Sequence, residues 1–234
     1  MSNYKNGKIN LYIMRHGETI LNRAKRTQGW CDGVLTKEGT YDVKCTGLGL
    51  KDIKFVAAYS SDLGRARKSA QIIINENKYR DNINLIELEG LREVSFGKYE
   101  GELEKIFEED MLKLLNVKSF EEADKLYELQ KEYCNACATL DDTNEAENYE
   151  IALKRSIDAL DYICKNNMRE DESNILIVAH GGIIRLIVDY IDKNINTREV
   201  YNASISKITF ENGKYSVKSI NDISYRENGK KLMR

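Results

Sequence analysis

The sequence has 234 residues, a net charge of −2 and 41% hydrophobic residues. This length suffices for a substantial hydrophobic core and predicts a single domain over residues 1–234. The first ten residues are polar and no apolar run approaches the length of a membrane span, so we expect a cytoplasmic protein without a membrane partner. Basic residues do not form a patch interleaved with aromatic ones, which argues against a nucleic-acid partner.

Apolar runs alternate with helical patterns along the chain. The expected strands cover residues 8–14, 55–60, 83–88, 175–179, 204–211 and 215–220, and the last two meet across an Asn-Gly turn. The expected helices cover residues 36–46, 62–77, 103–115, 120–138, 145–168 and 182–192. This alternation predicts a three-layer α/β/α fold with a mostly parallel central sheet.

Polar residues and glycines mark the ends of some expected helices. Thr36 is expected to cap the helix that follows it, and Gly47 and Gly49 are expected to end that helix. Asp62 is expected to cap the helix that runs to Asn77.

The two histidines of the chain occupy matching positions. His16 follows the first expected strand and His180 follows the fourth, and each is followed by glycine. Ligands of open α/β sheets bind beyond the carboxyl ends of the strands, and Gly17 would let the backbone approach whatever His16 faces. A lone histidine of this kind is more often a residue at the edge of the core, but the matching pair favours a functional site.

Three charged side chains lie in similar positions, namely Arg15, Arg65 and Glu93. Arginine offers forked donors that suit phosphate oxygens, and a helix N-terminus at Arg65 also favours anions. Neutral imidazole can take up a phosphoryl group, and nearby cations would help to keep His16 neutral. A carboxyl group can protonate a leaving alkoxide and then accept a proton from water. This chemistry needs no metal or other cofactor, and we expect neither.

These motifs resemble those of the histidine phosphatase superfamily, also called the phosphoglycerate-mutase-like family, over nearly the whole chain. The matching segments are Arg15-His16-Gly17-Glu18-Thr19 with Asn22, Gln28-Gly29-Trp30 with Asp32, Ser61-Asp62-Leu63-Gly64-Arg65-Ala66, LREVSFGKYEG around Glu93, and Ala179-His180-Gly181-Gly182. Glu147 and Arg155 fall at the spacing of a further family motif, in which the glutamate usually lies between Gly and Ser.

The resemblance implies roles for these residues. His16 would be the phosphorylated nucleophile and Glu93 the proton donor and acceptor. The other catalytic residues would be Arg15, Arg65 and His180, which complete the phosphate pocket. The substrate-binding residues would be Gly17, Asn22, Gln28, Gly29 and Gly181.

The family contains both mutases and phosphatases, and three features favour a phosphatase here. The segment after Glu93 lacks the Arg and His of the mutases, and His180 precedes Gly-Gly where mutases have Gly-Asn. Residues 101–150 contain fifteen Asp or Glu against five Lys, so the helical insertion expected at about 102–146 is acidic. An acidic segment over the site would disfavour bisphosphorylated substrates. We therefore expect hydrolysis of a small phosphorylated substrate.

Several alternatives stay open. The acidic residues could simply face solvent and have no bearing on the substrate. The chain could be a cofactor-dependent phosphoglycerate mutase, or a non-catalytic module that binds a phosphorylated ligand or a partner. Cys134 and Cys137 have CxxC spacing, although an acidic helical context favours two small apolar residues over a redox or metal site. A homodimer is expected only by base rate.

Overall fold

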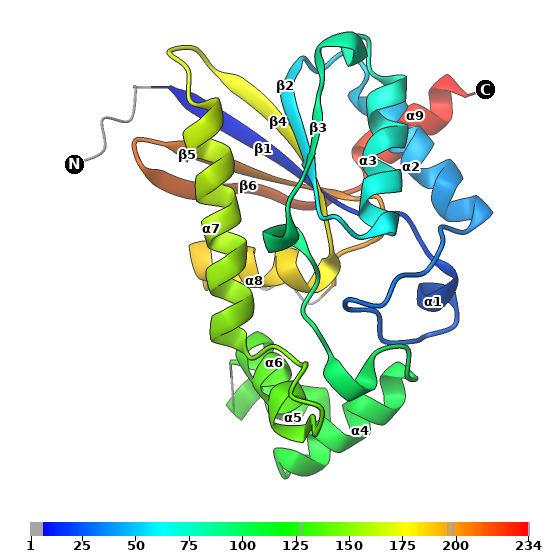
Figure 1. The fold of residues 1–234 in the computed structure, drawn as a ribbon, viewed down its shortest axis with the longest axis vertical. Helices are drawn as coiled ribbons and strands as arrows, with labels where there is room; N and C mark the ends of the chain where they lie inside the picture. Colours follow the sequence, from blue (N-terminus) through cyan, green and yellow to red (C-terminus); the bar gives the residue numbers. More distant parts are fainter. Residues whose placement is uncertain (1–6, 127, 196, 198, 234) are drawn as a thin grey trace.

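The computed structural model describes residues 7–126, 128–195, 197 and 199–233. Within these ranges, a six-stranded sheet has the order β3-β2-β4-β1-β5-β6 (Figure 1). Its strands are β1 (Lys8–Arg15), β2 (Phe55–Ser60), β3 (Leu85–Glu87), β4 (Ser173–Ala179), β5 (Ile205–Glu211) and β6 (Lys214–Asp222). The first four pair in parallel, and β5 pairs antiparallel with β1 and β6. The mostly parallel sheet is confirmed.

Helices cover both faces of this sheet, as the alternating pattern predicted. The helices are α1 (Ile20–Arg23), α2 (Lys37–Leu50), α3 (Gly64–Glu76), α4 (Glu104–Leu114), α5 (Phe120–Leu126), α6 (Leu129–Leu140), α7 (Tyr149–Asn167), α8 (Gly181–Ile191) and α9 (Ser224–Leu232). One hydrophobic cluster joins the sheet to α7 and α8, and a second joins its other face to α2 and α3. The α/β/α arrangement is therefore confirmed, and α9, which the sequence did not predict, packs on α2.

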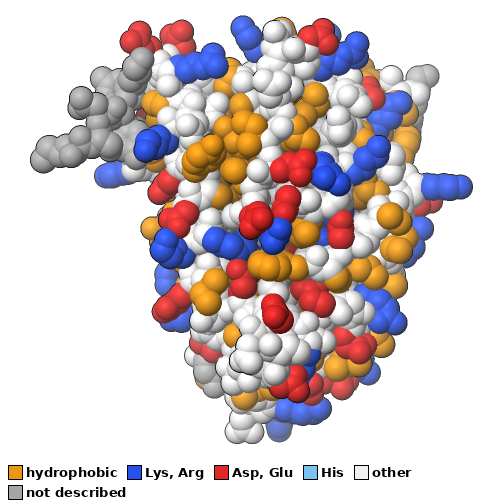
Figure 2. All heavy atoms as spheres, viewed as in Figure 1, with side chains coloured by type: hydrophobic (Ala, Val, Ile, Leu, Met, Phe, Trp, Pro, Cys, Tyr) orange, Lys and Arg blue, Asp and Glu red, His pale blue; other side chains and the backbone are white. Residues whose placement is uncertain are grey.

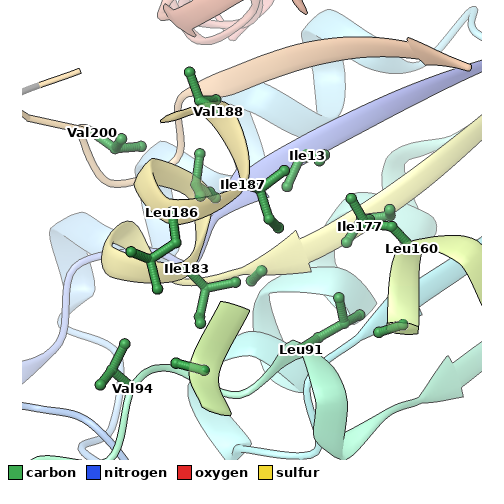
Figure 3. Packing of buried hydrophobic residues seen from close by; sticks show 14 of the residues in the cluster. Ile13, Leu91, Val94, Leu160, Ile177, Ile183, Leu186, Ile187, Val188 and Val200 are labelled. Atoms are coloured by element: carbon green, nitrogen blue, oxygen red, sulfur yellow. The ribbon is translucent and has the colours of Figure 1, made fainter. Parts of the chain in front are cut away.

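The central strands are buried on both faces because their side chains alternate between the two clusters. Ile13 and Ile177 pack toward Ile183 and Ile187 of α8 (Figure 3). Their neighbours, such as Val178, belong to the cluster on the opposite face. A strand buried on both faces reads as a continuous apolar run, which is why β1, β2 and β4 could be predicted from the sequence.

Helix α2 begins as predicted but ends later. The Thr36 hydroxyl accepts a hydrogen bond from the Gly39 amide at 2.9 Å, as a helix cap does. The prediction that Gly47 and Gly49 end this helix is wrong, since it continues to Leu50. Both glycines serve close packing instead. A Cβ atom at Gly47 would lie 3.2 Å from Ile73 of α3, and one at Gly49 would lie 2.0 Å from a backbone oxygen of α9.

Three other helix predictions need correction. Asp62 does not cap α3 but forms an ion pair with Arg92. The expected helix over residues 120–138 is two helices, α5 and α6, and Tyr127 between them lies outside the described residues. Helix α7 begins at Tyr149 rather than at residue 145, because Asn148 caps it through the Ile151 amide.

Helices α4, α5 and α6 lie together at one end of the molecule (Figure 1). They contain most of the expected acidic insertion, whose boundaries at about 102–146 remain a prediction. On the face drawn in Figure 2, Asp and Glu side chains are interspersed with Lys and Arg rather than gathered in one patch. None of the helices formed by the described residues is both long and apolar enough to cross a membrane.

Candidate active site

The two histidines meet because their strands are neighbours. Arg15 at the end of β1 lies opposite Ala179 at the end of β4, so His16 and His180, one residue further along each strand, lie side by side. Their ring centroids are 5.1 Å apart. Strand β2 pairs with β4 and also ends here, and it leads into α3 with Arg65 in its first turn. The chain thus brings the predicted catalytic groups to the carboxyl edge of three neighbouring strands.

The contacts of His16 identify the nitrogen that is available for attack. Its Nδ1 lies 2.7 Å from the Gly17 carbonyl oxygen, which can only accept, so Nδ1 holds the proton. Nε2 then carries the lone pair, which accepts a hydrogen bond from Arg65 Nε at 3.2 Å. Burial lowers the pKa of His16 well below its usual range, and Arg65 and Arg15 lower it further. His16 is therefore neutral, which is the form that can act as a nucleophile.

Two buried neutral histidines make stability depend on pH. The pKa of His180 is also lowered, first by burial and then by Arg65 and His16. The unfolded chain binds protons at both histidines below about pH 6.5, whereas the folded chain does not, so stability must fall as pH falls. We expect the free energy of unfolding to drop by about 1.4 kcal/mol for each histidine between pH 7.5 and 5.5.

Urea denaturation at pH 8.5, 7.5, 6.5 and 5.5 measures this effect. The curve should be nearly flat above pH 7.5, and a His180→Gln variant should lose about half of the decline below it. A wild-type stability that does not change between pH 7.5 and 5.5 would show that the folded protein protonates its histidines as readily as the unfolded chain.

Arg65 is held rigidly by the loop that follows α1. Its guanidinium donates to the Gly29 carbonyl oxygen at 2.6 Å, to the Cys31 carbonyl oxygen at 2.8 Å and to Asp32 Oδ1 at 3.0 Å. The side chain is fully buried, and the Asp32 partner is 35% exposed. These acceptors fix the charge beside Nε2 of His16, where it could bind an anion.

A serine that the sequence did not single out as functional orients His180. Ser61 Oγ lies 2.6 Å from His180 Nε2, and neither residue is exposed to solvent. His180 Nδ1 is buried and has no hydrogen-bond partner in the described part of the chain. If Ser61 donates to Nε2, Nδ1 holds the proton and can donate to a bound anion. Ser61 lies within the second-arginine motif, but nothing in that motif pairs it with a histidine 119 residues away.

Arg15 supplies a second, half-buried cation. One of its terminal nitrogens donates to the Val200 carbonyl oxygen at 2.6 Å. Its Nε is buried and has no partner among the residues that the structure describes. Burial lowers the pKa of Arg15, and Glu93 opposes that shift, so the guanidinium remains a cation with donors to spare.

Glu93 is fixed at the N-terminus of α8. Its carboxylate accepts hydrogen bonds from the amides of Gly182 at 2.8 Å, Ile183 at 3.0 Å and Val94 at 3.0 Å. A Cβ atom at Gly182 would lie 2.5 Å from one of the carboxylate oxygens. Glycine at this position therefore makes room for Glu93, which gives a structural reason for the Gly-Gly pair after His180.

A buried ion pair anchors the loop that leads to Glu93. Arg155 donates to Glu147 through two nitrogens, each at 2.6 Å, and to the carbonyl oxygens of Arg92 and Glu93 at 2.7 Å. The indole of Trp30 donates to the same Glu93 carbonyl at 2.9 Å, and the Arg92 guanidinium lies 4.8 Å from its ring centroid. These contacts set the position of the Glu93 backbone from outside the cavity.

Replacing Arg155 by Met should destabilise the protein by about 3 kcal/mol, because the partly buried Glu147 carboxylate would lose its partner. For a chain of this size we expect a fall in Tm of about 6–12 °C. The side chains of Arg155 and Glu147 are only 19% and 10% exposed. Thermal unfolding compares this variant with Lys154→Met, which removes a pair that is 77% and 62% exposed. The free energy of unfolding of that control should fall by about 0.5 kcal/mol. Equal losses of stability in the two variants would contradict the anchoring role of Arg155.

A cavity of about 550 Å³ opens in front of these groups. The predicted site residues that line it are Arg15, His16, Asn22, Gln28, Glu93 and Gly181. Arg65 and His180 are not among the lining residues, but both adjoin His16: Arg65 Nε lies 3.2 Å from His16 Nε2, and the His180 ring centroid lies 5.1 Å from that of His16.

Two predicted substrate-binding glycines, Gly17 and Gly29, are not among the residues that line this cavity, and both are closely packed, so their role in binding stays a prediction. A Cβ atom at Gly17 would lie 2.6 Å from Val43 of α2, and one at Gly29 would lie 2.3 Å from Glu100. Gly17 therefore allows the segment after β1 to approach α2, and Gly29 presents its carbonyl oxygen to Arg65.

The CxxC pair lies apart from the cavity. Cys134 and Cys137 are buried in α6 as free thiols, and neither lines the cavity. Burial raises the pKa of each thiol to about 12, which keeps the unreactive protonated form at neutral pH. These properties favour packing over redox chemistry.

Comparisons with known proteins agree with this geometry. A family model for the histidine phosphatase superfamily (branch 1) matches residues 11–223. A metal-independent phosphoserine phosphatase from Arabidopsis thaliana is 28% identical over 92% of this chain and 82% of its own. A 2,3-bisphosphoglycerate-dependent phosphoglycerate mutase from Methanococcus vannielii is 29% identical over 84% of this chain and 86% of its own. A phosphoglycerate mutase structure from Bacillus anthracis has a TM-score of 0.90 at 35% identity, covering 98% of this chain and 100% of that chain. The match over most of the chain shows that this protein belongs to the histidine phosphatase superfamily.

Proposed function

We propose that this protein is a metal-independent phosphomonoesterase that hydrolyses a small phosphorylated metabolite through a phosphohistidine on His16. The observation that supports this most directly is the state of His16. Its Nδ1 proton is engaged by a backbone carbonyl, its Nε2 has a lone pair, and two arginines lie beside it. No cofactor enters the proposed reaction.

In the first step, Nε2 of His16 attacks phosphorus and the ester P–O bond breaks. Arg15, Arg65 and His180 bind the phosphoryl oxygens and offset their negative charge. The leaving alkoxide takes a proton from the carboxyl group of Glu93, and the alcohol departs. His16 is left as a phosphohistidine and Glu93 as a carboxylate.

In the second step, Glu93 accepts a proton from a water molecule, and the resulting hydroxide attacks phosphorus. The P–N bond breaks, inorganic phosphate leaves, and His16 returns to its neutral form. The position of Glu93 in the cavity wall beside His16 is compatible with both proton transfers.

A phosphoglycerate mutase is the second candidate, and the 35% identity to the Bacillus anthracis protein of that name favours it. Its substrates bear a second anionic group. The part of the cavity wall formed by α4 and α5 contributes Glu104, Glu108, Glu121 and Asp124. Lys25, Arg26 and Arg185 also line the cavity, but the carboxylates on the α4 and α5 side would oppose a second phosphate or carboxylate there, so we favour the phosphatase.

The test is hydrolysis of p-nitrophenyl phosphate in the presence of EDTA, run beside the interconversion of 2- and 3-phosphoglycerate. EDTA-resistant release of nitrophenol with negligible isomerisation is the expected result. Hydrolysis that EDTA abolishes would contradict the metal-free mechanism. Efficient isomerisation with little hydrolysis would establish the mutase, and neither activity from folded protein would favour a binding module.

A further inference from the structure

The cavity is larger than a phosphate group requires. Its volume of about 550 Å³ falls within the range of pockets that enclose whole small molecules. Arg15 and His16 line one part of it, and α4 and α5 line another. The part formed by α4 would therefore face the alcohol of a bound phosphate ester, and its chemistry selects the substrate.

Two carboxylates of α4 face this space without partners among the residues that the structure describes. Glu104 and Glu108 both line the cavity and lie one helical turn apart, so they are neighbours on one face. Neither carboxylate has a hydrogen bond or an ion pair within the described ranges of the chain. The outward-facing acids of the same helix are paired, Glu109 with Lys105 at 3.4 Å and Asp110 with Lys113 at 3.3 Å. Within the described structure, the two acids that α4 turns toward the cavity are therefore unpaired, whereas its outward-facing acids are paired.

Unpaired like charges at this separation oppose each other. Partial burial raises the pKa of Glu108, and Glu104 raises it further. Lys25 opposes this shift but lies beyond ion-pair distance, although its backbone is hydrogen-bonded to Glu104. A cation placed between the two carboxylates would remove their repulsion and gain two charge-assisted contacts.

A buried hydroxyl provides a second, independent indication. Thr27 lines the same cavity, is only 4% exposed, and its Oγ1 has no hydrogen-bond partner in the described structure. Backbone hydrogen bonds join the segment that contains Thr27 to the start of α4, which places it beside Glu104. A buried hydroxyl oxygen without a partner can accept an N–H donor.

Aromatic rings complete this part of the wall. Phe96 and Tyr133 line the cavity and pack edge to face, with ring centroids 6.1 Å apart. Phe120 lines the cavity from α5. The Arg185 guanidinium, which also lines the cavity, already lies 6.0 Å from the Tyr133 ring centroid. The rings of Phe96 and Phe120 add electron-rich faces that favour an ammonium group.

From these observations we propose that the α4 side of the cavity binds a positively charged group on the alcohol of the substrate. The substrate class is then a phosphate monoester of an alcohol that bears an ammonium group. The inference rests on the proposed phosphatase function, since it assumes that the phosphate binds at His16. Glu104 and Glu108 contact the ammonium group, and Thr27 accepts one of its N–H donors.

The experiment compares O-phosphoethanolamine with propyl phosphate, an uncharged ester of nearly the same shape. We expect wild-type kcat/KM to favour the ammonium ester by about tenfold, the ratio that corresponds to about 1.4 kcal/mol. The double variant Glu104→Gln/Glu108→Gln should bring this ratio close to one. Glu109→Gln, on the solvent side of α4, should keep the wild-type ratio.

Two results would overturn the inference. One is a wild-type ratio of one or less, and the other is a preference that persists in the double variant. p-Nitrophenyl phosphate separates this test from that of the proposed function, because its hydrolysis by the wild type and by Glu109→Gln tests the phosphatase activity without an ammonium group on the substrate. If wild-type protein hydrolyses no ester, the phosphatase proposal fails. The binding affinities of the same two esters, measured by titration calorimetry, then still decide whether the α4 side of the cavity prefers a cation.

Discussion

His16→Ala should lower kcat for p-nitrophenyl phosphate by roughly four orders of magnitude or more, because no other described group can replace its nitrogen. The side chain is buried and its Nε2 faces Arg65, so the nucleophile is already oriented before substrate binds. Wild-type protein quenched with base during turnover should also contain phosphohistidine, which is acid-labile, and the variant should contain none. Phosphorus NMR or radiolabelled phosphate measures this intermediate.

A suitable control for His16→Ala is the double variant Cys134→Ser/Cys137→Ser. It removes both buried thiols of α6 and leaves every cavity residue in place. Activity per folded molecule should be unchanged. If this control loses activity while His16→Ala keeps substantial turnover, the thiols and not His16 would be the catalytic groups.

Glu93→Gln should lower kcat by about 10²- to 10⁴-fold for alkyl phosphates, since the poor leaving group needs its proton. For p-nitrophenyl phosphate, whose leaving group is stable as an anion, the loss in the phosphorylation step should be about tenfold or less. Glutamine keeps the shape of the side chain but cannot act as an acid or a base. Steady-state kinetics with phenyl, p-nitrophenyl and propyl phosphates gives the dependence on leaving-group pKa.

The two outcomes for Glu93→Gln are distinguishable. A rate that depends more steeply on leaving-group pKa than in wild type supports the acid role. An equal loss on all three esters would mean that Glu93 mainly positions other groups through the α8 N-terminus, where its carboxylate accepts two amide hydrogen bonds. Thermal unfolding of the variant must accompany the kinetics, because glutamine cannot accept both of those hydrogen bonds.

Much of the fold and site could be read from the sequence because the strands on which they depend are continuous apolar runs. The strands β1, β2 and β4 are neighbours in the sheet, and each ends in a motif with predicted site residues. Their parallel pairing brings His16 and His180 together, as expected from the rule that ligands bind at the carboxyl ends of such strands. A local sequence pattern is sufficient to predict a strand where burial on both faces requires apolar residues along its whole length.

Tertiary contacts decided the features that the sequence did not predict. Gly47 and Gly49 lie within a helix because neighbouring helices approach them, and such contacts cannot be read from a local pattern. Asp62 has the composition of a helix cap, yet it pairs with Arg92, which is 30 residues away in the sequence. The contact between Ser61 and His180 likewise depends on the strand order, which the sequence alone did not establish.

The orientation of the side chains in the acidic insertion also could not be predicted from the sequence. Its composition alone left open whether the carboxylates face solvent or substrate. The structure divides them by helix face: Glu104 and Glu108 line the cavity, whereas Glu109 pairs with a lysine at the surface. A net charge summed over a segment cannot make this distinction, because it depends on the rotation of each helix about its own axis.

The hydrogen bond between Trp30 and the Glu93 carbonyl has a practical consequence. Trp30 is the only tryptophan in the chain, and it is 39% exposed beneath the Arg92 guanidinium. Its fluorescence therefore originates from a single position, next to the backbone of the proposed acid–base residue. The emission of the native protein can report movement of that loop during a single turnover, with no label and no engineered probe.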